Sequence, residues 1–173
     1  FTELYLDHFF RDKEGLLTSL NEFVEGWNSG LLSPNPNTGQ FKAETFKLEE
    51  LNKLAFWSAT GSGKTLLMHV NVLQYQHYLQ LFEANHTINK VLLVTPNEGL
   101  SNQHLEEFRL SGMDAELFSK QAGGLFSGKK IEIIEISKLA EESGEKTVAI
   151  EAFETNNLVL IDEGHRGITG EQW

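Results

Sequence analysis

The sequence predicts an α/β fold in which a mainly parallel β-sheet lies between helices, with a helical segment ahead of it. Short apolar runs such as Val91–Thr95 and Leu158–Ile161 carry no polar face, which is typical of strands covered on both sides. These runs alternate with longer stretches of helical periodicity. Alternation of this kind indicates a parallel sheet packed against helices.

The first part of the chain has a different pattern. Aromatic and aliphatic side chains recur at helical spacing through residues 1–28, which predicts helices there. From Asn28 to Gln40 the composition changes to Ser, Asn, Gly and Pro, which indicates a loop. We therefore divide the chain into a helical lead-in with its loop, residues 1–45, and a main domain, residues 46–173.

Within the main domain, strands and helices are expected to alternate in the following order along the chain. The expected strands are Leu54–Ser58, Val91–Thr95, Ala115–Phe118, Ile131–Ile136, Thr147–Glu151 and Leu158–Ile161. The expected helices are Thr65–Phe82, Ser101–Leu110 and a short one at Ser137–Glu142.

Composition and charge exclude several classes of protein. A chain of 173 residues with 40% hydrophobic residues can fill one sizeable core. No stretch approaches the ~20 apolar residues of a membrane span, and the absence of cysteine excludes disulfides and cysteine-ligated zinc. We expect a cytoplasmic protein without a membrane partner. The net charge of −11 gives no global attraction to nucleic acid, so such binding would need a local patch.

The chain ends also carry an expectation. The sequence opens at Phe1 without an initiator Met and stops at Trp173 shortly after a motif. We expect it to be part of a longer protein.

A glycine-rich segment, Ser58–Thr65, lies between an expected strand and an expected helix. Gly61 and Gly63 can adopt backbone angles that turn successive N–H groups inward, so that a phosphate sits at the positive end of the helix. Lys64 would reach the β- and γ-phosphates of ATP, and the Thr65 hydroxyl would complete a Mg²⁺ shell. The residues expected to hold ATP are Ala59, Thr60, Gly61, Ser62, Gly63, Lys64 and Thr65. The alternative is an ordinary Gly/Ser turn before an amphipathic helix.

A second segment places two acids at the end of an apolar strand. Burying an unpaired charge is costly, so Asp162 and Glu163 are expected to face water or a metal ion. Asp162 would hold Mg²⁺, mostly through water, and Glu163 would orient and deprotonate the attacking water. The alternative is a plain junction between a strand and a loop. The pair together with the upstream Ser58–Thr65 segment favours a site that hydrolyses a nucleoside triphosphate.

Three segments together resemble the first RecA-like domain of superfamily 2 helicases and translocases, which are P-loop NTPases. Ala59–Thr65 (ATGSGKT) resembles their motif I, and Asp162–His165 (DEGH) resembles motif II. Thr95-Pro96-Asn97, followed by Leu100 and Gln103, is similar to motif Ia. The segments VTPNEGLSNQHLEEF and LVLIDEGHRG are most similar to the motor subunits of type III restriction enzymes. The resemblance covers about residues 51–170.

The resemblance implies further roles. Motif Ia of the family contacts the nucleic-acid backbone, which implies that Thr95, Pro96 and Asn97 lie along that track. The motif II histidine links the ATP site to nucleic acid, a role that His165 would inherit. Lys64, Asp162, Glu163 and His165 are thus the expected catalytic set. The family also implies a second RecA-like domain, without which this piece would be inactive, and nuclease or methyltransferase partner subunits.

Three functions follow as hypotheses. The leading one is an ATP-driven DNA helicase or translocase, the motor of a restriction or phage-defence system. The second is an RNA helicase of the DExH type, since backbone contacts carry little sequence information; we favour DNA. The third is a nucleotide-gated binding module that hydrolyses little. Retention of both Lys64 and Glu163 argues against the third, because a pure binding module can lose the catalytic acid.

Overall fold

The computed structural model describes residues 1–30, 42–59, 61–84, 88, 90–119, 131–140, 148–149 and 156–164. The chain divides into two compact units. The first comprises residues 1–62 and 74–82, and the second comprises residues 63–73 and 83–173.

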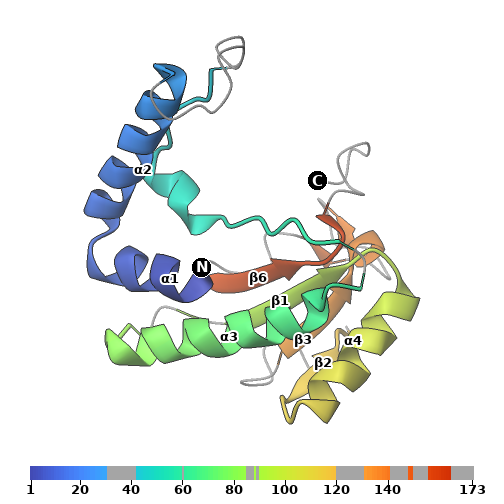
Figure 1. The fold of residues 1–173 in the computed structure, drawn as a ribbon. Helices are drawn as coiled ribbons and strands as arrows, with labels where there is room; N and C mark the ends of the chain where they lie inside the picture. The colour runs from blue at the N-terminus through green and yellow to red at the C-terminus, as the bar shows by residue number, and fades with distance from the viewer. Residues whose placement is uncertain are drawn as a thin grey trace. The chain divides into compact units, whose positions relative to one another are not determined.

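The second unit is built on a sheet of four parallel strands in the order β2-β3-β1-β6 (Figure 1). The strands are β1 (Lys90–Thr95), β2 (Ala115–Leu117), β3 (Ile131–Glu135) and β6 (Asn157–Ile161). All four lie within one residue of an expected strand at each end. The predicted α/β class, with a parallel sheet and helices ahead of it, is confirmed.

Strand β1 is the centre of this sheet. It pairs with β3 on one side, Leu93 opposite Ile133, and with β6 on the other, Leu93 opposite Leu160. Every residue of β1 is buried, as its continuous apolar pattern predicts. Strand β6 is paired on one side only among the described residues, and its Val159 and Ile161 side chains are exposed. The expectation of a strand covered on both faces therefore holds for β1 and not for β6.

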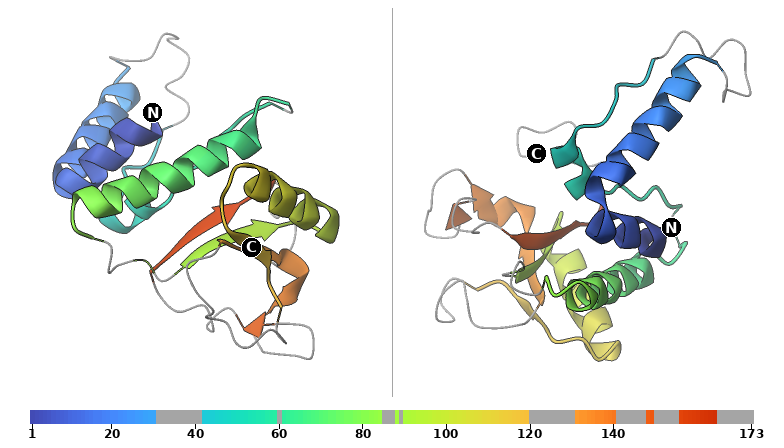
Figure 2. Two further views of the ribbon diagram at one scale, coloured as in Figure 1. Left: turned by 90° about the horizontal axis from the view of Figure 1, so that it is seen from below. Right: turned by 90° about the vertical axis from the view of Figure 1, so that its left-hand side faces the viewer.

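Two helices cover one face of the sheet (Figure 2). Helix α3 (Lys64–Leu81) contributes Val72, and helix α4 (Glu98–Leu110) contributes Phe108, both fully buried. They pack against alternate residues of the strands, because side chains at every second position share a face. The core cluster consists of Val72, Val91, Leu93, Phe108, Ala115, Ile131 and Ile133.

Both ends of α4 are set by local hydrogen bonds. The Asn97 side chain accepts a hydrogen bond from the Leu100 backbone N–H at 3.0 Å, so the helix begins earlier than its apolar periodicity predicts. At the other end Gly112 has φ of 72°, a left-handed conformation that glycine adopts without strain. The Met113 N–H then donates to the Phe108 carbonyl at 2.9 Å, which closes the helix in a Schellman-type arrangement.

The segment after β3 differs from the sequence prediction. A helix was expected over Ser137–Glu142, but the chain makes one 3-10 turn, η4 (Ile136–Lys138), and then a short strand, β4 (Leu139–Ala140). Strand β4 pairs in parallel with β5 (Val148–Ala149), inside the expected strand Thr147–Glu151. The helix prediction was wrong because this pairing uses backbone groups that a helix would have needed internally.

The regular elements of the first unit's described part are all helices. They are α1 (Thr2–Arg11), α2 (Lys13–Asn28), the 3-10 helix η2 (Leu48–Asn52) and the second half of α3. Asp12 separates the first two helices, and its side chain caps α2 by accepting from the Gly15 N–H at 2.9 Å. The Tyr5 hydroxyl donates to the Leu51 carbonyl at 2.7 Å. Aromatic rings join α1 to α3, with Phe10 stacked on Tyr78.

The strand expected at Leu54–Ser58 is not formed. Lys53 has extended backbone angles, but residues 53–59 belong to no strand. The physical reason is that a strand needs a hydrogen-bonded neighbour, and the other described elements of this unit are helices. Phe56 and Trp57 in this segment are exposed, Trp57 to 88%.

A buried ion pair joins β1 to β3, and it gives the first prediction. The Lys90 ammonium donates to the Glu132 carboxylate, and both side chains are buried in the sheet. Glu132→Ala removes a carboxylate from beside a buried ammonium, and we expect a loss of about 3–5 kcal/mol in the free energy of unfolding measured with urea.

The double variant Lys90→Met/Glu132→Leu is the control. Removing both charges together should restore stability close to that of the parent, because no charge is then buried alone. A loss of stability in the double variant as large as in Glu132→Ala would contradict this account of the pair.

Candidate functional site

The glycine-rich segment forms a tight turn immediately before α3. Gly61 and Gly63 have φ of 76° and 82°, which non-glycine residues adopt only with strain. The Ser62 N–H donates to the Ala59 carbonyl at 3.2 Å. A Cβ placed on either glycine would meet no atom within 4 Å, so the glycines are needed for backbone angle rather than for close packing. Thr60, one of the residues expected to hold ATP, lies outside the described residues.

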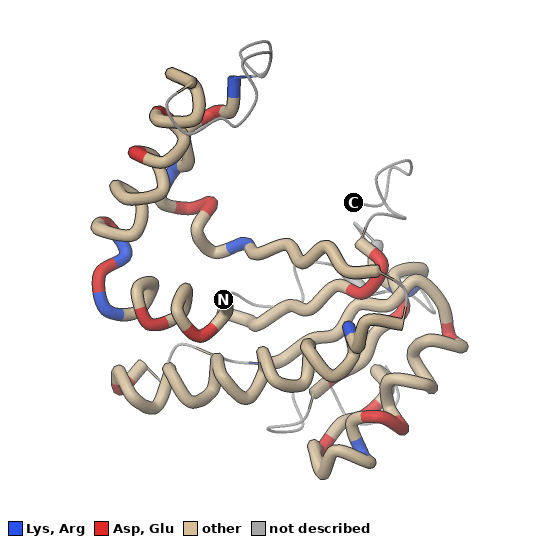
Figure 3. The backbone as a smooth tube through the Cα atoms, viewed as in Figure 1, with Lys and Arg blue, Asp and Glu red and all other residues tan. Residues whose placement is uncertain are grey.

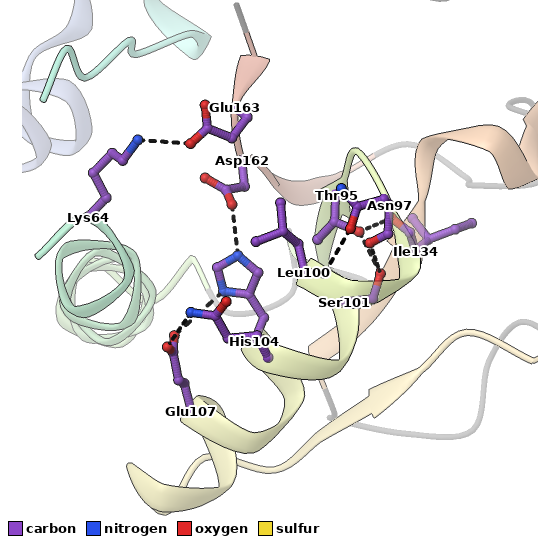
Figure 4. Close-up of polar contacts among 11 residues, drawn as sticks. Lys64, Thr95, Asn97, Leu100, Ser101, His104, Glu107, Ile134, Asp162 and Glu163 are labelled. Atoms are coloured by element: carbon purple, nitrogen blue, oxygen red, sulfur yellow. Dashed lines mark hydrogen bonds and ion pairs between the residues drawn. The ribbon is translucent and has the colours of Figure 1, made fainter. Parts of the chain in front are cut away.

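Lys64 and Thr65 stand in the first turn of α3, where backbone N–H groups have no partner within the helix. The Lys64 Nζ atom donates to Glu163 Oε1 at 3.0 Å (Figure 4). Both side chains are partly exposed, so the ion pair is weakened by solvent. The contact brings the start of α3 and the acidic segment after β6 together, although they are far apart in sequence.

Asp162 follows β6 directly and remains tied to β1. Its N–H donates to the Val94 carbonyl at 3.0 Å, which extends the strand pairing by one residue. Its carboxylate Oδ2 accepts from His104 Nε2 at 2.9 Å, and His104 is only 2% exposed. The hydrogen bond from His104 lowers the pKa of Asp162 below its ordinary value, against the opposing effect of burial. Asp162 is therefore ionised at neutral pH.

Glu163 has a strained backbone. Its φ of 54° lies in the left-handed region, which costs a non-glycine residue on the order of 1–3 kcal/mol and is found mainly at functional sites. The strain therefore marks Glu163 as a candidate functional residue. His165, the neighbouring candidate, lies outside the described residues.

His104 is a site residue that sequence reasoning missed. It lies on α4 between Ser101 and Phe108, and all three are buried. The spacing of three and four residues places it on the inward stripe of the helix, where an apolar residue is the rule. A histidine on the buried stripe of the helix that follows a strand end was the available signal.

The predicted nucleic-acid track is only partly on the surface. Thr95 is 1% exposed, and its hydroxyl lies 2.6 Å from the Ser101 hydroxyl (Figure 4). A direct contact between this side chain and nucleic acid is therefore not available in the structure. Pro96 is half-buried and Asn97 is exposed, but the Asn97 side chain caps α4. Thr95 instead contacts the first turn of α4 through the Ser101 hydroxyl.

Among the described residues, Lys and Arg are spread over several separate elements and are interspersed with Asp and Glu (Figure 3). Acidic residues outnumber basic ones in the whole chain, 25 to 14. None of the described helices combines the length and apolar composition that a membrane span requires.

The residues present fit a magnesium ion. Mg²⁺ prefers hard oxygen ligands such as a carboxylate, a hydroxyl and water. Asp162 is ionised and half-buried, and Figure 4 shows its second carboxylate oxygen pointing away from His104. Thr65 adds a hydroxyl beside Lys64, whose ammonium reaches the residue next to Asp162. Asp162 and Thr65 are the residues that would hold the ion.

The fold and these features define a class. A parallel sheet, a glycine turn that leads into a helix with Lys-Thr in its first turn, and an acidic pair after a neighbouring strand characterise a RecA-like P-loop domain. The model of a protein family described as type III restriction enzyme, res subunit, matches residues 18–173. The chain belongs to this family, and is therefore an ATP-binding domain of the superfamily 2 helicase and restriction type. No curated protein and no solved structure matches the chain.

Proposed function

We propose that this chain is the ATP-hydrolysing half of a DNA translocase or helicase, the motor of a restriction or phage-defence system. The contact between Lys64 Nζ and Glu163 Oε1 at 3.0 Å carries the proposal. It brings a phosphate-binding lysine and a candidate general base together at one end of the sheet. Family membership supports the class of activity, and the site supports the division of roles.

Each side chain has a separate task in the proposed chemistry. The N–H groups at the start of α3 and the Lys64 ammonium bind the β- and γ-phosphates. Asp162 and Thr65 hold Mg²⁺, which neutralises charge on the phosphates when bound. Glu163 orients the attacking water and accepts its proton. Catalysis in phosphoryl transfer is mostly positioning and electrostatic stabilisation, which suits a site made of charges on rigid strand and helix ends.

We also propose the domain boundaries, the location and the partners of the chain. Residues 1–45 form a helical lead-in with its loop, residues 46–173 form the ATP-binding domain, and the protein acts in the cytoplasm. A second RecA-like domain would supply the opposite wall of the site, including an arginine, and nuclease or methyltransferase subunits would act beside it. Arginines supplied in this way contribute about 10³–10⁵ in rate, so residues 1–173 alone should hydrolyse ATP barely or not at all.

Lys64→Ala in the intact protein should reduce ATP turnover by a factor of about 10²–10³ or more, because it removes the positive charge that faces the transferred phosphate. Phosphate release measures the effect. Lys53→Ala, an exposed lysine ahead of the glycine turn, is the matched control and should leave turnover unchanged. A rate for Lys64→Ala within a few-fold of the parent would end the proposal.

Glu163→Gln should separate binding from hydrolysis. The amide cannot act as a base, so turnover should fall to background, while Asp162 still serves the metal ion. The substitution also removes the carboxylate that faces Lys64. The phosphates of ATP then no longer compete with that carboxylate for the Lys64 ammonium. A partly exposed ion pair contributes at most about 1 kcal/mol, so ATP affinity should rise by no more than about five-fold. Calorimetry with ATP measures this, and a large loss of affinity would contradict the roles assigned here.

DNA should stimulate ATP turnover in the intact protein, and stimulation should fade as salt rises, because phosphate contacts release counterions. Steady-state rates with DNA, with RNA and without nucleic acid, each over a series of salt concentrations, test this. Stimulation by RNA alone would favour an RNA helicase. A rate indifferent to both at low salt would favour a nucleotide-gated binding module.

A further inference from the structure

His104 lies on α4, the helix that follows β1, and contacts the acidic segment after β6. The N-terminal end of this helix is fixed by Asn97. Its Nε2 atom lies 2.9 Å from Asp162 Oδ2 (Figure 4). The side chain is almost fully buried, so water does not compete for this hydrogen bond.

The chemistry of the two groups determines which atom carries the proton. An ionised carboxylate can only accept hydrogen bonds, so His104 Nε2 must be the donor. The other ring nitrogen, Nδ1, faces Glu107 Oε2 at 3.9 Å, which is beyond hydrogen-bond range. Glu107 is itself held by Gln103, whose Nε2 donates to Glu107 Oε1 at 2.8 Å. Burial and the hydrogen bond to Asp162 thus hold the ring in one orientation.

A carboxylate at the end of a strand can rotate about its side-chain bonds unless something holds it. Asp162 is anchored at its backbone by Val94, and its carboxylate accepts hydrogen bonds from His104 and from the Glu163 backbone N–H. With Oδ2 engaged by His104, Oδ1 is the oxygen directed away from the histidine (Figure 4), and it is the oxygen that we assign to a hydrated cation. Neighbours that orient metal-binding side chains in this way typically contribute 10–100-fold to metal affinity.

We propose that His104 is a positioning residue for the magnesium site. It donates Nε2–H to Asp162 Oδ2 and holds the carboxylate so that Oδ1 faces the metal ion; this rests on the proposed function of Asp162. Because His104 belongs to α4, the same contact ties the metal ligand to the helix that begins at Asn97. The orientation of Asp162 therefore depends on the position of α4.

The test measures the metal ion's contribution to nucleotide binding. Calorimetry of the full chain with ADP, in excess Mg²⁺ and again in EDTA, gives two dissociation constants whose ratio reports that contribution. We define the ratio as the dissociation constant in EDTA divided by the dissociation constant in Mg²⁺. For His104→Leu we expect this ratio to fall by about 10- to 100-fold, while the dissociation constant in EDTA stays unchanged. If the parent ratio is itself smaller than this factor, it should fall to one. Mn²⁺ affinity in the presence of ADP, followed by electron paramagnetic resonance, should fall in parallel.

Two further substitutions separate positioning from structural support. His104→Gln can place an amide N–H near the position of Nε2 and should recover most of the ratio, whereas the shorter His104→Asn should not. If His104→Leu fails to fold, the comparison of Gln with Asn replaces it. His69→Leu is the matched control. His69 lies on α3 and is also buried, but its Nδ1 atom lies 2.8 Å from the Ser111 hydroxyl and forms a hydrogen bond with it rather than with Asp162.

The outcomes are distinct. An unchanged ratio in His104→Leu, or an equal loss of affinity with and without Mg²⁺, overturns the positioning role and leaves the proposed function standing. A ratio that falls as far in His69→Leu also overturns it. A parent chain that binds no ADP in either buffer overturns both the role of His104 and the proposed function.

Discussion

The parallel pairing of β1 with β6 is the constraint on which the site depends. Residue by residue it sets Val94 opposite Ile161, and the Asp162 N–H continues the ladder to the Val94 carbonyl. The two strands therefore end at the same level, and Asp162 lies level with Thr95, the last residue of β1. Ligand sites of open α/β sheets form in the crevice outside such carboxyl ends of the strands. A shift of one residue in this register would turn the side chains of β6 to the opposite face.

The charged side chains of the site are paired with one another. Lys64 forms an ion pair with Glu163, and His104 donates a hydrogen bond to the Asp162 carboxylate. Two adjacent carboxylates would otherwise repel each other at the end of a strand. The same contacts orient the side chains. Lys64 points toward Glu163, and His104 on α4 holds the Asp162 carboxylate. Glu163, whose carboxylate accepts from Lys64, also has a left-handed backbone.

Much of this could be predicted from the sequence because it follows from local periodicity. Continuous apolar runs locate β1 and β6, and the glycines at 61 and 63 are needed where the backbone takes positive φ. What could not be predicted depends on partners distant in sequence. The apolar run at Leu54–Ser58 has the composition of a strand, but pairing depends on a neighbour that its own pattern does not encode. Thr95 illustrates the same point, since its burial follows from the position of α4.

His104 shows why the site was harder to predict than the fold. Single motifs identify groups that touch a ligand, because the chemistry requires particular residue types at a fixed spacing. A residue that acts through another needs only to be within reach, and His104 reaches Asp162 from 58 positions away. Its sole local signal is that a polar residue takes a place on the buried stripe of α4.

The exposed tryptophan ahead of the glycine turn has a practical consequence for spectroscopy. Trp57 is 88% exposed and is followed at once by Ser58, where the proposed phosphate-binding segment starts. An indole in water fluoresces at long wavelength and is readily quenched by small solutes. The chain thus carries an intrinsic optical reporter beside its nucleotide loop. Because the sequence has no cysteine, a single introduced thiol could carry a second dye without competing labels.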